Sequence, residues 1–499
     1  MPGVDSYILL ALIAVPFLGG LSLVFVPSRE VYAIRVIAVG LSLLLLGLSA
    51  YVFLAYDSDV GGYQFAADYE WLPALGIKLL LGVDGISVPM VLLTGIVTFT
   101  GVLISWSIES RPKDFFVLFF LLVAGVFGVF VSLDLFFFFF FYEIAVLPMY
   151  LLIGVWGSSS DFGSFLRPKE YGAMKLMIYL VAGSVLVWVG ILALYVEAGL
   201  DTFSLLRLEG EVFSPGFQAF FFPFFMVGFG ILAGLWPFHT WSPDGHVAAP
   251  TSVSMLHAGV LMKLGAYGII RVGLDLLPQG AEDWMPVLIG LGTVNVIYGA
   301  VAAMGQRDLK YVIGYSSVSH MGYVLIGFAT LNAVGMGGAV LQMFSHGIMT
   351  ALLFAAVGVI YDRTHIRDIG VLEGLAKRMG MTAAFFAVAG LTSLGLPGLS
   401  GFVAELMVFI GAFQSYPLVG VLGVIGAAIT AVYILRLLGK VFFGPLGTRW
   451  EGLTDATRLE GFSMGILVIF LLAVGLYPRP WMDMINSGVV PLLERVAGL

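Results

Sequence analysis

Long runs of apolar residues, separated by short polar connections, cover almost the whole chain. A helix needs about 20 apolar residues to cross the hydrocarbon core of a bilayer, since each residue adds about 1.5 Å. The pattern therefore predicts an all-α, polytopic membrane protein with about 14 transmembrane helices. We expect these spans at residues 7–26, 32–55, 80–106, 114–133, 135–155, 171–197, 218–241, 251–271, 285–305, 310–331, 336–361, 380–413, 417–443 and 461–478.

Two of the predicted spans contain helix-breaking residues. The seventh carries Pro237 within LWPFHTWSP, and the twelfth carries Pro397 within GLPGLSG. Proline removes a backbone donor and glycine loosens the backbone, so we expect both helices to open in mid-membrane. Each broken helix is the fourth of five spans, which is the arrangement expected of two inverted five-helix repeats.

This arrangement divides the chain into four parts. We expect the first three helices in residues 1–113, the first repeat in 114–271 and the second repeat in 285–443. Residues 444–499 then hold the last helix and an amphipathic C-terminal tail.

The basic residues are distributed unequally between the two sides of the predicted bundle. Sixteen Lys and Arg residues, Lys310 among them, fall in connections on one side, and five, including Arg271, fall on the other. Cytoplasmic loops are enriched in Lys and Arg. The distribution therefore predicts that both termini lie on the non-cytoplasmic side.

Composition excludes several kinds of protein. Of the 499 residues, 60% are hydrophobic and 11% are charged, against roughly a quarter charged in soluble proteins, so no soluble catalytic domain fits. The chain has no cysteine, which excludes thiolate-held iron–sulfur clusters and cysteine-based zinc sites. No histidine pair has zinc-motif spacing, no nucleotide-binding motif occurs, and the net charge of −8 is spread over many loops. We expect no cofactor, no metal and no nucleic-acid partner, and a lipid environment.

Three ionisable residues lie deep inside predicted spans: Glu143, Lys263 and Glu405. A lone charge near the middle of a bilayer costs at least about 3 kcal/mol, so residues of this kind usually line proton or ion paths. Glu405 also follows the Gly401 break by four residues, which places a half-helix end near it. The alternative is that each is a neutral, hydrogen-bonded group that fixes helix packing.

Histidine is the side chain that most readily exchanges protons near neutral pH. His320 lies in the polar stretch YSSVSH, and His346 follows Gln342 by one helical turn, so either can relay protons. His239 and His246 flank the seventh-span break with Asp244 between them, and His257 precedes Lys263 by six residues. Lys175 is also inside a span, four residues after Tyr171, where it can either take part in the path or extend toward the surface.

At these residues the sequence resembles a known family, the antiporter-like membrane subunits of respiratory complex I, and within it bacterial subunit M and mitochondrial subunit 4. The resemblance covers most of the chain. It rests on GVDGIS at 82–87, FYE at 141–143 with Pro148, PFHTW at 237–241, APT at 249–251, YSS at 315–317 with His320, and GLPG at 395–398 with Glu405.

The resemblance implies a proton-translocating subunit of an NADH-quinone oxidoreductase in the bacterial inner membrane. Partners would be other membrane-arm subunits, with quinone bound and reduced elsewhere in the complex. It also implies that Glu143, Lys263, His320, His346 and Glu405 match the family's central charged axis. We therefore take Glu143 as a proton-holding site, Lys263 as the central relay and Glu405 as the acid toward the exit, joined by a water-lined path past the two histidines.

One position departs from the family pattern. The family usually has a lysine five residues before the proline of the PFHTW motif, paired with the glutamate of the fifth span, and this chain has Leu232 there. Glu143 therefore lacks its expected partner. This keeps open two alternatives: a subunit of a membrane-bound hydrogenase or cation/proton antiporter complex, and a structural spacer that does not pump.

Overall fold

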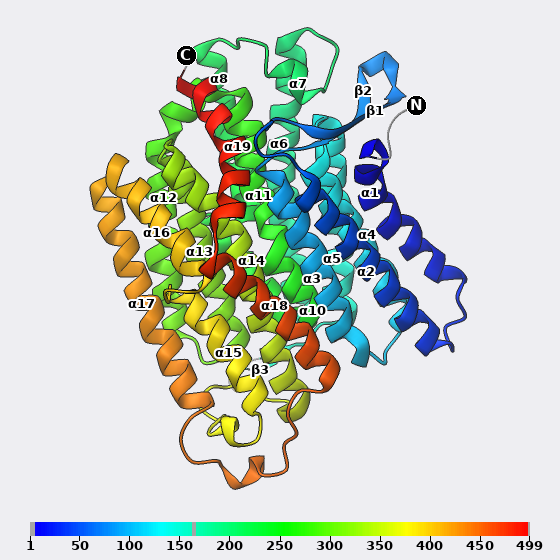
Figure 1. Cartoon of the computed structure of the whole chain (residues 1–499), viewed down its shortest axis with the longest axis vertical. Helices are drawn as coiled ribbons and strands as arrows, with labels where there is room; N and C mark the ends of the chain where they lie inside the picture. The colour runs from blue at the N-terminus through cyan, green and yellow to red at the C-terminus, as the bar shows by residue number, and fades with distance from the viewer. Residues whose placement is uncertain (1–4, 162–165, 498–499) are drawn as a thin grey trace.

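The computed structural model describes residues 5–161 and 166–497, and these form a bundle of membrane-length helices (Figure 1). Within the described residues, 13 helical segments are long and apolar enough to cross a membrane. The predicted twelfth span is present as two shorter apolar helices, which brings the total to the 14 predicted spans. The spans are α1 (Asp5–Ser22), α2 (Val31–Ala55), α3 (Ser87–Ile104), α4 (Pro112–Val131), α5 (Leu135–Trp156), α6 (Lys169–Ala198), α8 (Pro215–Ala233) with α9 (Trp241–Ala248), α10 (Thr251–Leu256) with α11 (Met262–Gly268), α12 (Pro278–Gly305), α13 (Leu309–Ala329), α14 (Ala333–Thr364), α15 (Gly380–Ser393) with α16 (Ser400–Ser415), α17 (Pro417–Val441) and α18 (Arg458–Leu476).

The remaining elements lie between these spans or, in the case of α19, after the last span. They are α7 (Leu205–Leu208), α19 (Arg479–Ala497), the strands β1 (Gln64–Leu72), β2 (Ile77–Val83), β3 (Ser160–Asp161) and β4 (Leu166–Arg167), and the 3₁₀ turns η1 (Leu23–Phe25), η2 (Pro73–Leu75), η3 (Ser105–Ser107), η7 (Leu375–Lys377) and η8 (Thr448–Trp450).

The seventh span is broken as predicted. Helix α8 ends at Ala233, and the next residue, Gly234, has a left-handed φ of +80°. The chain resumes through the 3₁₀ turn η4 (Phe238–Thr240) into α9. The side chain of Asn295 closes the gap: its Oδ1 accepts from the Trp236 N–H at 2.6 Å and its Nδ2 donates to the Gly234 carbonyl at 2.7 Å. A neutral amide on α12 thus supplies hydrogen bonds that a continuous helix would make internally.

The twelfth span is also broken as predicted. Helix α15 ends at Ser393 and α16 begins at Ser400. Gly395 and Gly398 between them have φ values of +71° and +94°, which other residues rarely adopt. The N-terminal turn of α16 therefore lies inside the bundle, close to Glu405.

The eighth span is less regular than the sequence predicted. Two π-helical turns, η5 (His257–Leu261) and η6 (Ile269–Leu274), flank α11. Such turns are rare and are often found at functional sites. Here they rotate the helix on both sides of Lys263.

The prediction that residues 80–106 form one span was wrong at its start. Residues 77–83 form β2, which pairs antiparallel with β1, and α3 begins only at Ser87. Only Asp84, Gly85 and Ile86 separate the apolar residues of β2 from those of α3, so hydropathy alone does not separate the strand from the helix.

The hairpin, α7 and the C-terminal helix α19 lie at the same end of the bundle, the upper end of Figure 1. Tyr56 and Ser487 are in contact there, with hydroxyl oxygens 3.3 Å apart, and Arg495 forms an ion pair with Asp275. Helices α1 and α17 lie on opposite flanks. Helix α14 and the eighth span lie between these flanks, and their most apolar stretches are fully buried, so ionisable residues there are enclosed by protein.

Candidate functional site

Lys263 and His346 form a direct contact in the buried centre. Lys263 on α11 is fully buried and His346 on α14 is 1% exposed. The Lys263 Nζ lies 2.6 Å from the His346 Nδ1 and also donates to the Ala258 carbonyl. When Lys263 is an ammonium it can only donate, so Nδ1 then accepts and the neutral ring carries its proton on Nε2. That Nε2 has no hydrogen-bond partner within the described residues.

His320 and Glu405 form a second contact. The His320 Nδ1 lies 3.1 Å from the Glu405 Oε1, and its Nε2 lies 2.9 Å from the Ser393 hydroxyl at the twelfth-span break. The Gln342 Nε2 lies 3.3 Å from the same Nδ1 and 3.4 Å from the same carboxyl oxygen. When Nδ1 carries a proton it can donate to Glu405, and when it does not it can accept from Gln342. The groups around His320 can therefore hydrogen-bond its Nδ1 in either protonation state.

The two contacts are neighbours. The rings of His320 and His346 have centroids 5.4 Å apart, so Lys263, His346, His320 and Glu405 form one row across four helices. We call this row the central axis. The sequence predicted that a water-lined path joins these residues. In the structure, Lys263 contacts His346, His320 contacts Glu405, and the two histidine rings are adjacent.

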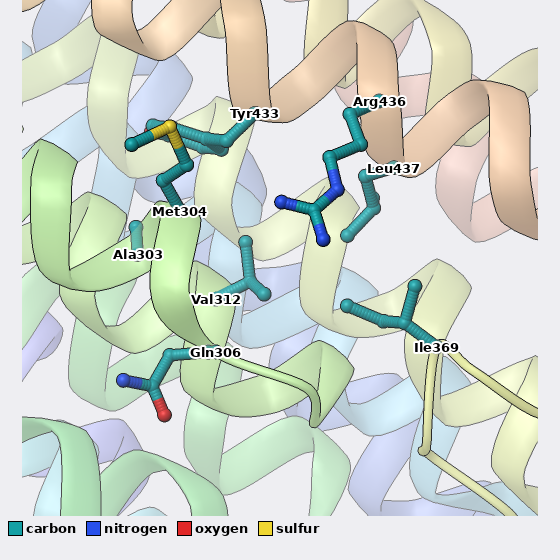
Figure 2. A pocket seen from close by; sticks show the side chains of 8 residues that line it. All are labelled: Ala303, Met304, Gln306, Val312, Ile369, Tyr433, Arg436 and Leu437. Atoms are coloured by element: carbon teal, nitrogen blue, oxygen red, sulfur yellow. The ribbon is translucent and has the colours of Figure 1, made fainter.

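Hydroxyl groups extend the polar region around the central axis. The Ser345 and Ser400 hydroxyls are 2.7 Å apart, and the Tyr433 hydroxyl donates to Ser316 at 2.7 Å. Figure 2 shows Tyr433 and Arg436 of α17 on the wall of a cavity of about 20 Å³, which is room for a single water.

Lys175 does not extend to the surface. Its Nζ lies 2.8 Å from Asp244 Oδ2 on α9, and Asp244 also pairs with Arg167 and accepts from the Tyr311 hydroxyl at 2.8 Å. The sequence left a choice between the proton path and the surface; the structure instead places Lys175 in an ion-pair network that ties α6 to the distal half of the broken seventh span. Lys310, which we counted as a loop residue, is also buried, and its Nζ donates to the Ala249 carbonyl at 2.7 Å.

The remaining histidines of this region are buried without hydrogen-bond partners within the described residues. This holds for both ring nitrogens of His239, His246 and His257. The His239 ring contacts Tyr298, with centroids 4.9 Å apart. The His246 and His257 rings face each other, with centroids only 4.0 Å apart.

Glu143 lies apart from the central axis. It is half-buried on α5, its Oε1 has no hydrogen-bond partner among the described residues, and Ser184 of α6 is the hydrogen-bonding side chain near it. Leu232 is fully buried in α8. No hydrogen bond or ion pair within residues 5–161 and 166–497 links Glu143 to Lys263 or to Lys175.

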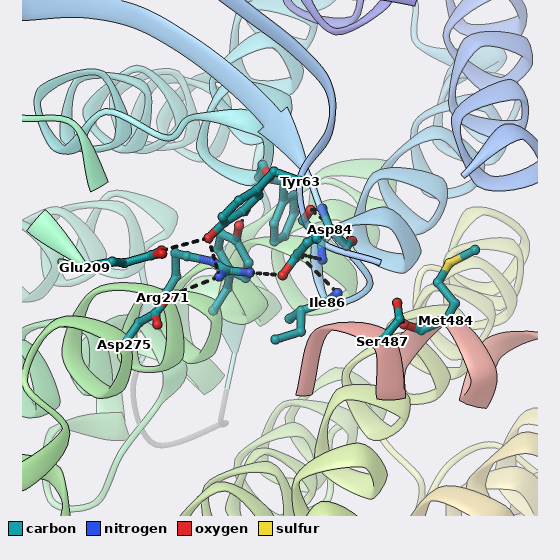
Figure 3. Close-up of polar contacts among 12 residues, drawn as sticks. Tyr63, Asp84, Ile86, Glu209, Arg271, Asp275, Met484 and Ser487 are labelled. Atoms are coloured by element: carbon teal, nitrogen blue, oxygen red, sulfur yellow. Dashed lines mark hydrogen bonds and ion pairs between the residues drawn. The ribbon is translucent and has the colours of Figure 1, made fainter. Parts of the chain in front are cut away.

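The sequence missed a second ionisable cluster, shown in Figure 3. Arg271 pairs with Asp84, donates to the Tyr63 hydroxyl at 2.7 Å, and lies 3.2 Å from Asp275. Arg495 of α19 also pairs with Asp275 and lies 3.9 Å from Glu209. Burial and the nearby Asp275 carboxylate raise the pKa of Glu209 to about 7. Asp84 within the GVDGIS motif was the available signal, but its partners come from other segments of the chain.

Comparisons with known proteins agree with this architecture. Residues 132–430 match the family described as NADH:quinone oxidoreductase/Mrp antiporter, TM. The NAD(P)H-quinone oxidoreductase chain 4 of Gloeobacter violaceus is 38% identical over 95% of this chain and 90% of its own length. Among solved structures, a chain of respiratory complex I from Thermus thermophilus aligns with a TM-score of 0.88 and 26% identity, covering 97% of this chain and 99% of that one. A chain of the Mrp complex from Dietzia has a TM-score of 0.87 at 21% identity, covering 99% and 98%, which is a likeness of fold.

Proposed function

Because the chain belongs to the NADH:quinone oxidoreductase/Mrp antiporter transmembrane family, we propose that it is a proton-translocating membrane-arm subunit of an NAD(P)H-quinone oxidoreductase. The redox reaction takes place on other subunits, where quinone is bound. This chain contributes buried acids and bases through which protons cross the membrane. Its partners are the neighbouring membrane-arm subunits and lipid.

The observation that carries the proposal is the central axis. Four residues that exchange protons lie in one row inside a bundle of apolar helices, from Lys263 to Glu405. An imidazole accepts a proton on one nitrogen and releases one from the other, so His346 and His320 can pass a proton between Lys263 and Glu405 without a net change. Glu405, beside the twelfth-span break, is the acid that passes the proton onward.

Replacement of Glu405 by Gln tests this assignment. The amide preserves the size of the side chain and can still contact Gln342 and His320, but it cannot hold and release a proton. In the assembled complex reconstituted in vesicles, we expect the number of protons moved per quinone reduced to fall by the share that this subunit transports. Undiminished protons per quinone reduced would remove Glu405 from the path.

Cation exchange is the second candidate function. It is favoured by Leu232, which stands where the family usually has the lysine that pairs with Glu143. In the part of the chain that the structure describes, Glu143 has one carboxyl oxygen without a partner, and α8 contains no lysine to face it. A carboxylate oxygen is also a ligand for a hard cation. Dependence of transport on sodium, with a Glu143→Gln variant that loses it, would favour this candidate over proton transport alone.

The remaining assignments are part of the same proposal. The two broken helices, each fourth in its set of five, support division into repeats at 114–271 and 285–443.

The surplus of Lys and Arg at one end supports a cytoplasmic position for that end in a bacterial inner membrane. Reactivity of single cysteines introduced at Glu211 and at Arg378 toward a membrane-impermeant thiol reagent in intact cells tests the orientation, because this chain has no cysteine of its own.

A further inference from the structure

His246 and His257 form a buried pair that the central axis does not include. Both rings are fully buried, with centroids 4.0 Å apart and planes inclined by 47°. All four ring nitrogens are without a hydrogen-bond partner in the described part of the chain. Buried polar atoms are nearly always hydrogen-bonded, so four in one place require an explanation.

The pair lies between two buried lysines. His257 begins the π-helical turn η5 and precedes Ala258, whose carbonyl accepts from Lys263. On the other side, the Ser254 hydroxyl donates to the carbonyls of His246 and Ala249, at 2.8 and 3.2 Å. The Ala249 carbonyl in turn accepts from Lys310 at 2.7 Å.

Lys310 lines a cavity of about 180 Å³, enough for several waters at about 30 Å³ each. Its other polar walls are Ser105, Ser158, Thr251, Ser252, Tyr361 and Asp362. The cavity lies at the Lys- and Arg-rich end of the bundle, next to Trp156 at the end of α5. A cavity of this size and lining has room for water beside Lys310.

We propose that His246 and His257 form the entry leg of the proton path, which carries protons from the Lys310 cavity to Lys263; this rests on the proposed function. The Lys310 ammonium gives up a proton toward His246 and regains one from water in the cavity. Each imidazole accepts a proton on one nitrogen and releases one from the other. The neutral amine of Lys263 accepts the proton and becomes the ammonium that donates to His346.

The alternative is a purely structural pair. Trp241 stacks on His257, with centroids 5.2 Å apart, and Phe354 contacts His246 at 5.7 Å. If ring packing is the only role, phenylalanine preserves it and proton transport is unaffected. If the nitrogens matter, phenylalanine removes the function and keeps the shape.

The experiment uses the assembled complex in proteoliposomes and compares protons moved per quinone reduced. Lys263→Ala defines the share of proton transport that depends on this subunit. We expect His257→Phe and His246→Phe to reduce that share at least tenfold, while Phe354→Leu, which changes the same ring cluster without removing a nitrogen, retains it. Full transport in assembled His257→Phe complexes would overturn the entry leg.

Two further comparisons keep the test decisive. If a phenylalanine variant does not assemble, His257→Gln and His246→Gln replace it, since an amide cannot relay protons, and full transport with them overturns the proposal. If Lys263→Ala itself transports normally, the proposed function fails. If Lys263→Ala loses proton transport while both histidine variants keep full transport, the entry leg is refuted and the proposed function stands.

Discussion

The Nζ of Lys263 and the Nδ1 of His346 lie 2.6 Å apart in the fully buried centre of the bundle. Since an ammonium donates and a neutral ring nitrogen accepts, one proton lies between the two groups. A second charge on the histidine would place two cations in contact in a region of low dielectric, which is strongly unfavourable. The pair therefore holds at most one positive charge, on one member or the other.

The pair predicts different outcomes for two substitutions of His346. Glutamine can accept from Lys263 through its amide oxygen but cannot pass a proton on, so we expect His346→Gln to assemble normally and to lose proton transport. Leucine leaves the Lys263 ammonium with only the Ala258 carbonyl, and the loss of a buried acceptor should destabilise the subunit by about 1–3 kcal/mol. Thermal unfolding and proton transport of the purified complexes measure the two effects. Normal transport by His346→Gln would contradict a relay role.

The ion pair between Lys175 and Asp244 leads to a prediction about stability. Asp244 pairs with Lys175 and Arg167 and accepts from Tyr311, so Asp244→Asn leaves two partly buried cations without their counter-charge. We expect a loss of about 1–3 kcal/mol and a lower yield of assembled complex. Lys175→Met removes one partner only and should cost less. If Lys175→Met assembles but no longer supports proton transport, the lysine takes part in the path as well as in the ion pair.

Sequence reasoning identified the charged members of the central axis because a charge within an apolar run is conspicuous. Glu405, Lys263, His320 and His346 stand out in this way. Their contacts did not follow from the sequence, since these depend on how four helices are rotated against one another. The neutral partners were missed for a different reason: Asn295, for example, is a common residue type whose role appears only beside the broken backbone of the seventh span.

The sequence also did not reveal the irregular elements, such as the two π-helical turns of the eighth span. Spans such as residues 251–274 are buried on every side, so their apolar residues show no periodic face that would reveal the π-helical turns. The Arg271 cluster was missed because Arg271 falls at a helix end, where a basic residue normally extends to the surface. Its acidic partners Asp84 and Asp275 are brought to it by the hairpin and by the helix itself.

Leu232→Lys tests whether Glu143 can regain a partner. Leu232 is fully buried, and Gly265 allows the backbone of α8 to lie close to α11 at this position. A lysine there is costly unless its charge is compensated, and the unpartnered Glu143 oxygen is the group that the family pattern would pair with it.

A double-mutant comparison measures that pairing. We expect Leu232→Lys to be tolerated with Glu143 present and to lose about 1–3 kcal/mol more in a Glu143→Gln background. Leu232→Met, which adds no charge, is the control and should be insensitive to the change at Glu143. Equal destabilisation in both backgrounds would show that the two side chains do not meet in this chain.

The Glu209 carboxyl predicts a dependence of stability on pH. Burial, and then the nearby Asp275 carboxylate, raise its pKa from 4.5 to about 7, while Arg495 and Arg271 act in the opposite direction. A raised pKa in the folded state means that the folded protein binds this proton more tightly than the unfolded chain does. The stabilisation is complete below about pH 4.5 and is lost as the pH rises through about 7.

Glu209→Gln should remove this dependence, because an amide does not ionise. We expect the variant and the original protein to unfold at similar temperatures near pH 5, and the variant to unfold at the higher temperature near pH 8. Glu211→Gln, an exposed position two residues further along the chain, is the matched control and should leave the pH profile unchanged. Thermal unfolding of the purified complex from pH 5 to 8 measures all three, and parallel profiles for Glu209→Gln and the original protein would show that Glu209 is not the group that titrates.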